Sequence, residues 1–237
     1  MKFTSIFLVC FVLSQTGWSY SRFGETLCHQ PGYKCLKIKR GDSWAQLYTD
    51  PVERDLVRRI NRMNVFLEPN MIIAVPEKLK GLSINDVSPF AAFLPSGSQK
   101  QIYVALEKQA WAAYDYNGKL VKWGPLSAGS EKCLDQTEGC QTPTGAFSVT
   151  RKHGMDCVSN KFPQRMDGRR GGGEMPFCIF FYKGYALHGS SDLPGYPASY
   201  GCLRLFVEDA QWLNNEFVEL PVDGKRGTQV IINDGQE

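Results

Sequence analysis

The stretch ASYGCLRL (residues 198–205) follows His188 along the chain, and its Cys202 comes fourteen residues after that histidine. A thiol becomes a useful nucleophile when a neighbouring group takes its proton, and imidazole is the usual partner. Gly201 precedes the cysteine and would let backbone amides approach a developing oxyanion. Arg204, two positions later, would project from the same face of a strand and could bind a carboxylate. The stretch therefore predicts a cysteine acyl-transfer site.

The N-terminus has the pattern of a secretory signal. Lys2 is followed by an apolar run over residues 3–13 and by small residues at Gly17 and Ser19, so we expect a signal peptide over 1–19. The apolar run is too short to span a bilayer as a helix. We therefore expect an exported protein that lies in a periplasm or against a cell wall.

The mature chain keeps seven cysteines, and an odd number in an exported protein indicates one unpaired thiol. Two pairs flank short turn-rich segments, and a third pair flanks a glycine-rich stretch. The expected disulfides are Cys28–Cys35, Cys133–Cys140 and Cys157–Cys178. Cys202 is then left as a free thiol. The alternative is that Cys202 is half of a disulfide, which is the commoner state of a cysteine in an exported chain.

The charge pattern limits the partners. The net charge is +3 and dispersed, without a long basic run or a phosphate-binding loop, so nucleic acid is not expected. A modest positive charge suits an anionic polymer such as a bacterial wall. We expect no cofactor, no metal and a monomer.

Residues 33–77 have the pattern of a small βααβ unit. Ser43 is the expected cap of a first helix, and a second helix is expected over about 52–64. One face of the second helix is apolar and the other carries arginines (Arg54, Arg58, Arg59 and Arg62). The unit resembles a LysM module, a small glycan-binding domain, in KRGDS (39–43), in Asn61 or Asn64 after the second helix, and in IAVP (73–76). Glycan binding is the expected role, and a packing module is the alternative.

Residues 78–98 are predicted as a linker, and residues 99–234 as a mainly β domain. Asn117-Gly118 is a strong hairpin signal within that domain. Strands are expected over 101–106, 110–115, 120–123, 126–130, 142–150, 176–182, 185–188 and 229–232, with one helix over 206–213. Segment 151–177 is long, basic and rich in glycine, and we interpret it as a loop that covers the substrate.

The signature around His188 and Cys202 resembles that of the YkuD-type L,D-transpeptidases. The similarity rests on His188-Gly189 followed by SYGCLR (199–204), with AG (128–129), TPTGAF (142–147) and GTQVII (227–232) around them. It covers roughly residues 99–234. The resemblance implies an antiparallel β-sandwich with one or two helices, and a role in cell-wall biogenesis and cell shape.

The resemblance also implies roles for individual residues. The catalytic residues would be Cys202, His188 and Gly189, and the oxyanion- or substrate-binding residues Ser199, Tyr200, Gly201 and Arg204. Cys202 would attack the carbonyl between the third and fourth residues of a peptidoglycan stem peptide, and His188 would accept and relay the proton. An amine from a second stem, an anchored lipoprotein, a free D-amino acid or water would then resolve the thioester.

Tyr200 departs from the family, which commonly has histidine at this place. That histidine is not the expected base, so catalysis should survive the change. Rival enzymes fit the sequence less well: cell-wall cysteine peptidases of the NlpC/P60 type place the cysteine before the histidine, and sortases separate the two much further. A wall L,D-carboxypeptidase and a non-catalytic wall-binding or adhesion protein remain as alternatives.

Overall fold

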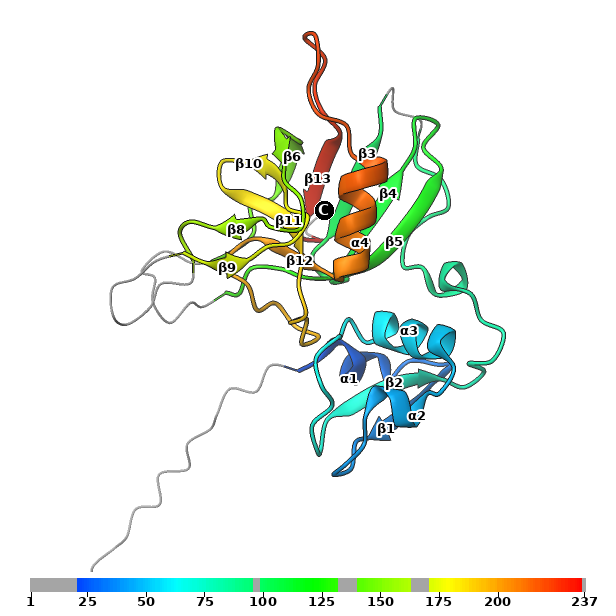
Figure 1. Cartoon of the computed structure of the whole chain (residues 1–237). Helices are drawn as coiled ribbons and strands as arrows, with labels where there is room; N and C mark the ends of the chain where they lie inside the picture. Colours follow the sequence, from blue (N-terminus) through cyan, green and yellow to red (C-terminus); the bar gives the residue numbers. More distant parts are fainter. Residues whose placement is uncertain (1–20, 96–98, 132–139, 163–170, 236–237) are drawn as a thin grey trace, which may run out of the picture.

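The computed structural model describes residues 21–95, 99–131, 140–162 and 171–235 (Figure 1). The predicted signal peptide over 1–19 lies outside these residues. A small N-terminal module (residues 21–77) and a larger β-rich part follow one another along the chain. In the described ranges, none of the helices has the length and apolar character that crossing a membrane requires.

The N-terminal module contains the predicted βααβ order. Its elements are α1 (Phe23–Leu27), β1 (Tyr33–Lys37), α2 (Trp44–Leu47), α3 (Pro51–Ile60) and β2 (Ile72–Pro76), with β1 and β2 antiparallel. Ser43 caps α2 by accepting from the N–H of Gln46, as the sequence predicts. The second helix ends at Ile60, four residues before the predicted end, because the chain turns at Arg62 with φ of 57°.

The arginine face of α3 is not a solvated surface. Arg59 is 4% exposed and Arg62 is 3% exposed, since this side of the helix contacts the larger part of the chain. Arg59 donates to both carboxylate oxygens of Asp209, at 2.6 and 3.1 Å. Arg62 donates to the carbonyl of Lys108 at 3.0 Å. The module is therefore docked through its arginines, a role that the helical pattern alone does not reveal.

The larger part is built on one mixed sheet, which confirms the prediction of a mainly β domain. Among the described residues its strand order is β6-β13-β3-β4-β5-β12-β11-β10-β7. The strands are β3 (Gln101–Ala105), β4 (Ala110–Tyr114), β5 (Leu120–Ser127), β6 (Gly145–Ser148), β7 (Arg151–Lys152), β10 (Ile179–Tyr182), β11 (Tyr185–Gly189), β12 (Leu203–Leu205) and β13 (Gln229–Asn233). The pairs β13–β3 and β11–β12 are parallel, unlike the expected antiparallel pairing. In both pairs the connection is long enough for the crossover that a parallel pair requires.

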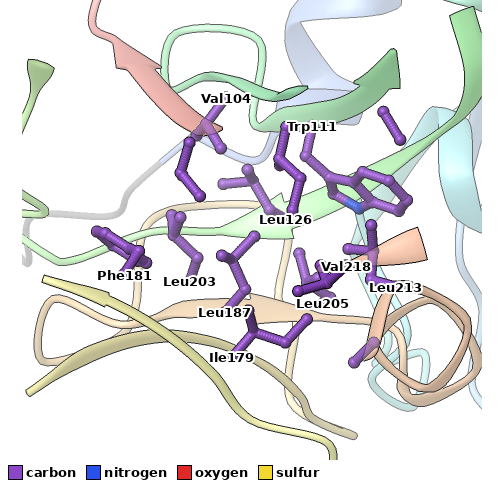
Figure 2. Close-up of a cluster of buried hydrophobic side chains, with 14 of the residues drawn as sticks. Val104, Trp111, Leu126, Ile179, Phe181, Leu187, Leu203, Leu205, Leu213 and Val218 are labelled. Carbon is purple, nitrogen blue, oxygen red and sulfur yellow. The ribbon is translucent and has the colours of Figure 1, made fainter. Parts of the chain in front are cut away.

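The sheet curls so that its two halves face each other across the core. Figure 2 shows Val104, Trp111 and Leu126 on one side and Ile179 and Leu187 on the other. All five are fully buried. Helix α4 (Val207–Trp212) and the π-helical turn η2 (Leu213–Phe217) close one side of this core. Both elements follow directly after β12 in the chain. Their packing in the core therefore also holds β12, the strand that begins beside the candidate site.

The predicted linker packs against the outer face of the sheet. It contains a 3-10 turn, η1 (Ile84–Val87), whose Ile84 carbonyl accepts from the indole of Trp123 at 2.8 Å. The Tyr114 hydroxyl donates to the carbonyl of Ala91 at 2.9 Å. The described part of the segment, up to residue 95, is thus a packed connection between the two parts of the chain.

The cysteines pair in part as predicted. Cys157 and Cys178 form a disulfide. Cys140 is also disulfide-bonded, and its predicted partner Cys133 lies outside the described residues.

The predicted Cys28–Cys35 disulfide is absent, because both cysteines are free thiols in the structure. Burial, followed by the neighbouring Cys35, raises the pKa of Cys28 to about 12.

Candidate active site

His188 lies on β11, and Cys202 comes one residue before β12, the strand that pairs with β11 in parallel. His188 pairs in register with Arg204, and Leu187 with Leu203. Because successive side chains of a strand point to opposite faces, the leucines enter the core while His188, Cys202 and Arg204 share the other face. The alternation of leucine with polar residues along these strands therefore packs one face into the core and places His188, Cys202 and Arg204 on the other.

This second face lines a cavity of about 1040 Å³. His188, Cys202 and Arg204 form its floor together with Ser199 and Tyr200. The predicted covering loop supplies a wall through the short strands β8 (Val158–Ser159) and β9 (Gly173–Glu174), and residues 163–170 of that loop lie outside the described residues. Gly189 and Gly201 do not line the cavity, but their backbones contact the side chains of His188 and Ser199, which do. The structure thus brings all seven predicted site residues to one place.

The imidazole of His188 is oriented by its own neighbour. Its Nδ1 lies 2.9 Å from the carbonyl oxygen of Gly189, so Nδ1 carries the proton and Nε2 holds the lone pair. Burial lowers the pKa of His188 to about 4; the positive charge of Arg204 adds to this, and the contact with Gly189 opposes it. The ring is therefore neutral at neutral pH and can accept a proton.

Cys202 is a free thiol. Burial raises its pKa, while the backbone N–H of Ala186 and the charge of Arg204 act in the opposite direction. The thiol is consequently protonated at rest, and its attack needs a base at the moment of reaction. This arrangement favours general-base activation over a preformed thiolate.

A network of backbone contacts holds the peptide that precedes the thiol. Thr142 donates from its hydroxyl to the carbonyl of Gly201 at 2.9 Å and accepts from the N–H of Gly129 at 2.9 Å. The hydroxyl of Ser199 donates to the carbonyl of Cys202 and accepts from the N–H of Gly201 at 3.0 Å. The amide of Gly201 is therefore engaged by Ser199, which leaves the neighbouring amides of Tyr200 and Cys202 as candidates for an oxyanion hole. Thr142 is part of the TPTGAF stretch that resembles the family, but the sequence does not indicate its supporting role, which depends on a contact with Gly201 across the fold.

Arg204 is already paired in the structure. Its Nη1 lies 2.7 Å from Oδ2 of Asp192 and 3.2 Å from the carbonyl oxygen of the same residue. A substrate carboxylate would have to compete with that aspartate. Asp192 was not singled out from the sequence, where it is one charged residue in a polar turn.

Tyr200 packs against the covering loop. Its ring stacks on Phe162, with centroids 4.9 Å apart and planes at 18°. Both rings line the cavity. Tyr200, which replaces the histidine common in the family signature, thus connects the residues around Cys202 with segment 151–177.

We expect Gly201→Ala to damage the site through the backbone. Gly201 has φ of 106°, and a Cβ there would lie 2.6 Å from the Tyr185 ring. Such a conformation costs an L-residue about 1–3 kcal/mol, so both the free energy of unfolding and the reactivity of Cys202 should fall. Urea unfolding and thiol alkylation measure the two effects. Gly184→Ala is the matched control, because Gly184 also lines the cavity and a Cβ there meets nothing within 4 Å; equal losses in both variants would contradict the argument.

The buried His188 should make folding pH-dependent. Its pKa of about 4 lies below the ordinary value of 6.5, so the unfolded chain binds a proton more readily than the folded one between these values. Above pH 6.5 the neutral His188 costs the folded state nothing. As pH falls from 6.5 towards 4, the free energy of unfolding should decrease by about 3 kcal/mol. Unfolding free energies measured from pH 4 to 7 should differ in slope between wild type and His188→Gln. Parallel curves would contradict a buried neutral imidazole.

The sequence profile of the YkuD family, described as the L,D-transpeptidase catalytic domain, matches residues 99–232. Among solved structures, an L,D-transpeptidase fragment from Xylanimonas cellulosilytica is 24% identical with a TM-score of 0.52, over 76% of this chain and 78% of that chain. An L,D-transpeptidase from Stackebrandtia nassauensis is 17% identical with a TM-score of 0.44, over 91% and 77%. The catalytic domain of the E. faecium L,D-transpeptidase is 20% identical with a TM-score of 0.43, over 59% and 100%. No curated protein sequence matches the chain.

Proposed function

The chain belongs to the YkuD family of L,D-transpeptidase catalytic domains, and we propose that it is an exported enzyme that cross-links peptidoglycan stem peptides through a Cys202 thioester. The observation that carries the proposal is that His188, on β11, and Cys202, one residue before the adjacent strand β12, line one cavity. The free state of Cys202 supports an enzyme over a wall-binding protein in which this cysteine is oxidised.

In the proposed first step, a donor tetrapeptide enters the cavity with the carbonyl of its third residue beside Cys202. Nε2 of His188 takes the thiol proton as sulfur bonds to that carbonyl carbon. The amides of Tyr200 and Cys202 would stabilise the negative oxygen of the tetrahedral intermediate. The intermediate collapses, the peptide bond to the fourth residue breaks, and the proton on His188 passes to the leaving amine. A D-amino acid departs and a thioester remains.

In the proposed second step, an amine attacks the thioester. His188 accepts the proton of this amine as the new amide bond forms, and returns a proton to sulfur as Cys202 leaves. The side-chain amine of the third residue of a second stem would give a 3→3 cross-link. An amine of an anchored lipoprotein or a free D-amino acid would be joined by the same chemistry, and water would give a carboxypeptidase.

Export and wall binding are also part of the proposal. The pattern of residues 1–19 supports export to a periplasm or cell wall. The βααβ order of the N-terminal module supports a LysM-like, glycan-binding role. We propose that peptidoglycan is the partner of both parts and that the protein acts as a monomer without nucleic acid or cofactor.

The experiment that tests the proposal offers the mature protein a disaccharide-tetrapeptide and analyses the products by mass spectrometry. We expect D-alanine and a 3→3 cross-linked dimer to appear in equal amounts. Released D-alanine with only hydrolysed stem would identify a carboxypeptidase. If neither product forms while Cys202 remains titratable as a free thiol, the proposed function is wrong.

A further inference from the structure

The segment between His188 and Cys202 leaves the larger part and packs on the N-terminal module. Leu193 of this segment is fully buried, and Pro194 forms a β-bridge with Met63 of the module. The carbonyl of Gly195 accepts from the N–H of Phe23 at 2.7 Å. The connection between the two catalytic residues is thus held by a part of the chain more than a hundred residues earlier in sequence.

Asn64 makes the densest set of these contacts. Its side-chain Nδ2 donates to the carbonyl of Ser190 at 2.7 Å, and its Oδ1 accepts from the N–H of Leu193 at 2.8 Å. Its own N–H donates to the carbonyl of Leu193 at 3.0 Å. One asparagine therefore fixes both ends of the turn 190–193.

Asp192 lies inside the turn that Asn64 holds. Its side chain is exposed and would be free to move, yet its carboxylate lies 2.7 Å from Nη1 of Arg204. Arg204 stands two residues from Cys202, on the same face of β12 and in the same cavity. Exposed ion pairs are weak on their own, so the position of this one depends on the backbone that carries the aspartate.

We propose that Asn64 is a positioning residue, which holds Asp192 against Arg204 and so sets the charge that a substrate meets beside Cys202. With the pair in place, the positive charge of Arg204 is offset. If the turn 190–193 moves and takes Asp192 away, the charge of Arg204 is no longer offset, and an anionic group of a substrate binds more favourably beside Cys202. This inference rests on the proposed function for its meaning to catalysis, because it concerns selection by the same site.

The test compares alkylation of Cys202 by iodoacetate, which is anionic, and iodoacetamide, which is neutral. Both displace iodide from carbon and form a thioether at sulfur, so their rate ratio reports the local charge. Because Cys28 and Cys35 are also free thiols, the adduct at Cys202 is quantified on its own peptide by mass spectrometry. No transpeptidation is needed, and a failure of the proposed function is therefore distinguishable from a failure of this inference.

We expect Asp192→Asn to raise the iodoacetate-to-iodoacetamide ratio about threefold, the size expected for one solvent-screened charge near a half-buried thiol. Asn64→Ala should raise it in the same direction by a smaller amount, since its backbone bond to Leu193 remains. In the Asp192→Asn background, Asn64→Ala should add nothing, because the carboxylate through which it acts is gone.

Asn61→Ala is the matched control. Asn61 is a buried asparagine of the same module, and its side chain bonds only to Val57 and Ala74 in the described structure. Its loss should lower module stability without changing the ratio. The inference is overturned if Asp192→Asn or Asn64→Ala leaves the ratio at the wild-type value, or if Asn61→Ala raises it equally.

Discussion

Replacing Cys202 with serine is expected to lower kcat/KM for cross-linking by about 10⁴-fold or more. A hydroxyl in the place of a thiol is far less ionisable and less nucleophilic, and the neutral His188 is too weak a base to compensate. Formation of the dimer, release of D-alanine and the acyl-enzyme mass on the peptide that contains residue 202 are the measurements.

Cys35→Ser is the control for this prediction. Cys35 is also a free thiol, but it is exposed on β1 of the N-terminal module. This variant should retain the wild-type rate. If cross-linking persists in Cys202→Ser, or if both variants lose activity alike, the thiol of Cys202 is not the nucleophile.

Replacing Arg59 with alanine is expected to lower the free energy of unfolding by about 3–5 kcal/mol. Asp209 is fully buried, and Arg59 gives it two hydrogen bonds across the contact between the module and the larger part. Without Arg59, Lys122, whose Nζ lies 3.2 Å from Oδ1 of Asp209, is the cation that still pairs with this carboxylate in the described part of the chain. A buried charge that loses most of its pairing is costly. Urea unfolding followed by tryptophan fluorescence measures the change.

Two further variants sharpen the Arg59 prediction. Arg54→Ala lies on the same helix, where Arg54 donates to the carbonyl of Tyr48, and should cost about 1 kcal/mol or less. The double variant Arg59→Met with Asp209→Leu should recover much of the loss, because no charge is left buried. A loss in Arg59→Ala no larger than in Arg54→Ala would contradict the role of this pair.

The sequence predicts the elements of the site better than its contacts. Alternation around Leu187 and Leu203 is enough to expect strands whose polar face carries His188 and Cys202. The signature also leads to Arg204, but the partner of that arginine comes from a turn whose position depends on tertiary packing. Pairing of β11 with β12 is parallel and non-local, so it follows from the closed core and has no local sequence signal.

The burial of Arg59 on α3 is a second feature that the sequence pattern does not predict. A helix with one apolar face and one charged face is ordinarily half-solvated, and this pattern favours a free module. Burial of Arg59 depends on Asp209, which lies 150 residues later. No pattern within the helix encodes that partner. For the same reason, the residues 78–95 look like a tether in sequence and pack against the sheet in the structure.

The distance between Arg59 and Asp209 along the chain also bears on how the protein is made. The N-terminal module is synthesised first, and its Arg59 then has the carboxylate of Asp55 on the same helix, while Asp209 follows only 150 residues later. Until Asp209 has been synthesised, Arg59 lacks the buried carboxylate to which it gives two hydrogen bonds in the folded chain. The contact between the module and the larger part can therefore form only late in synthesis, after both have been made.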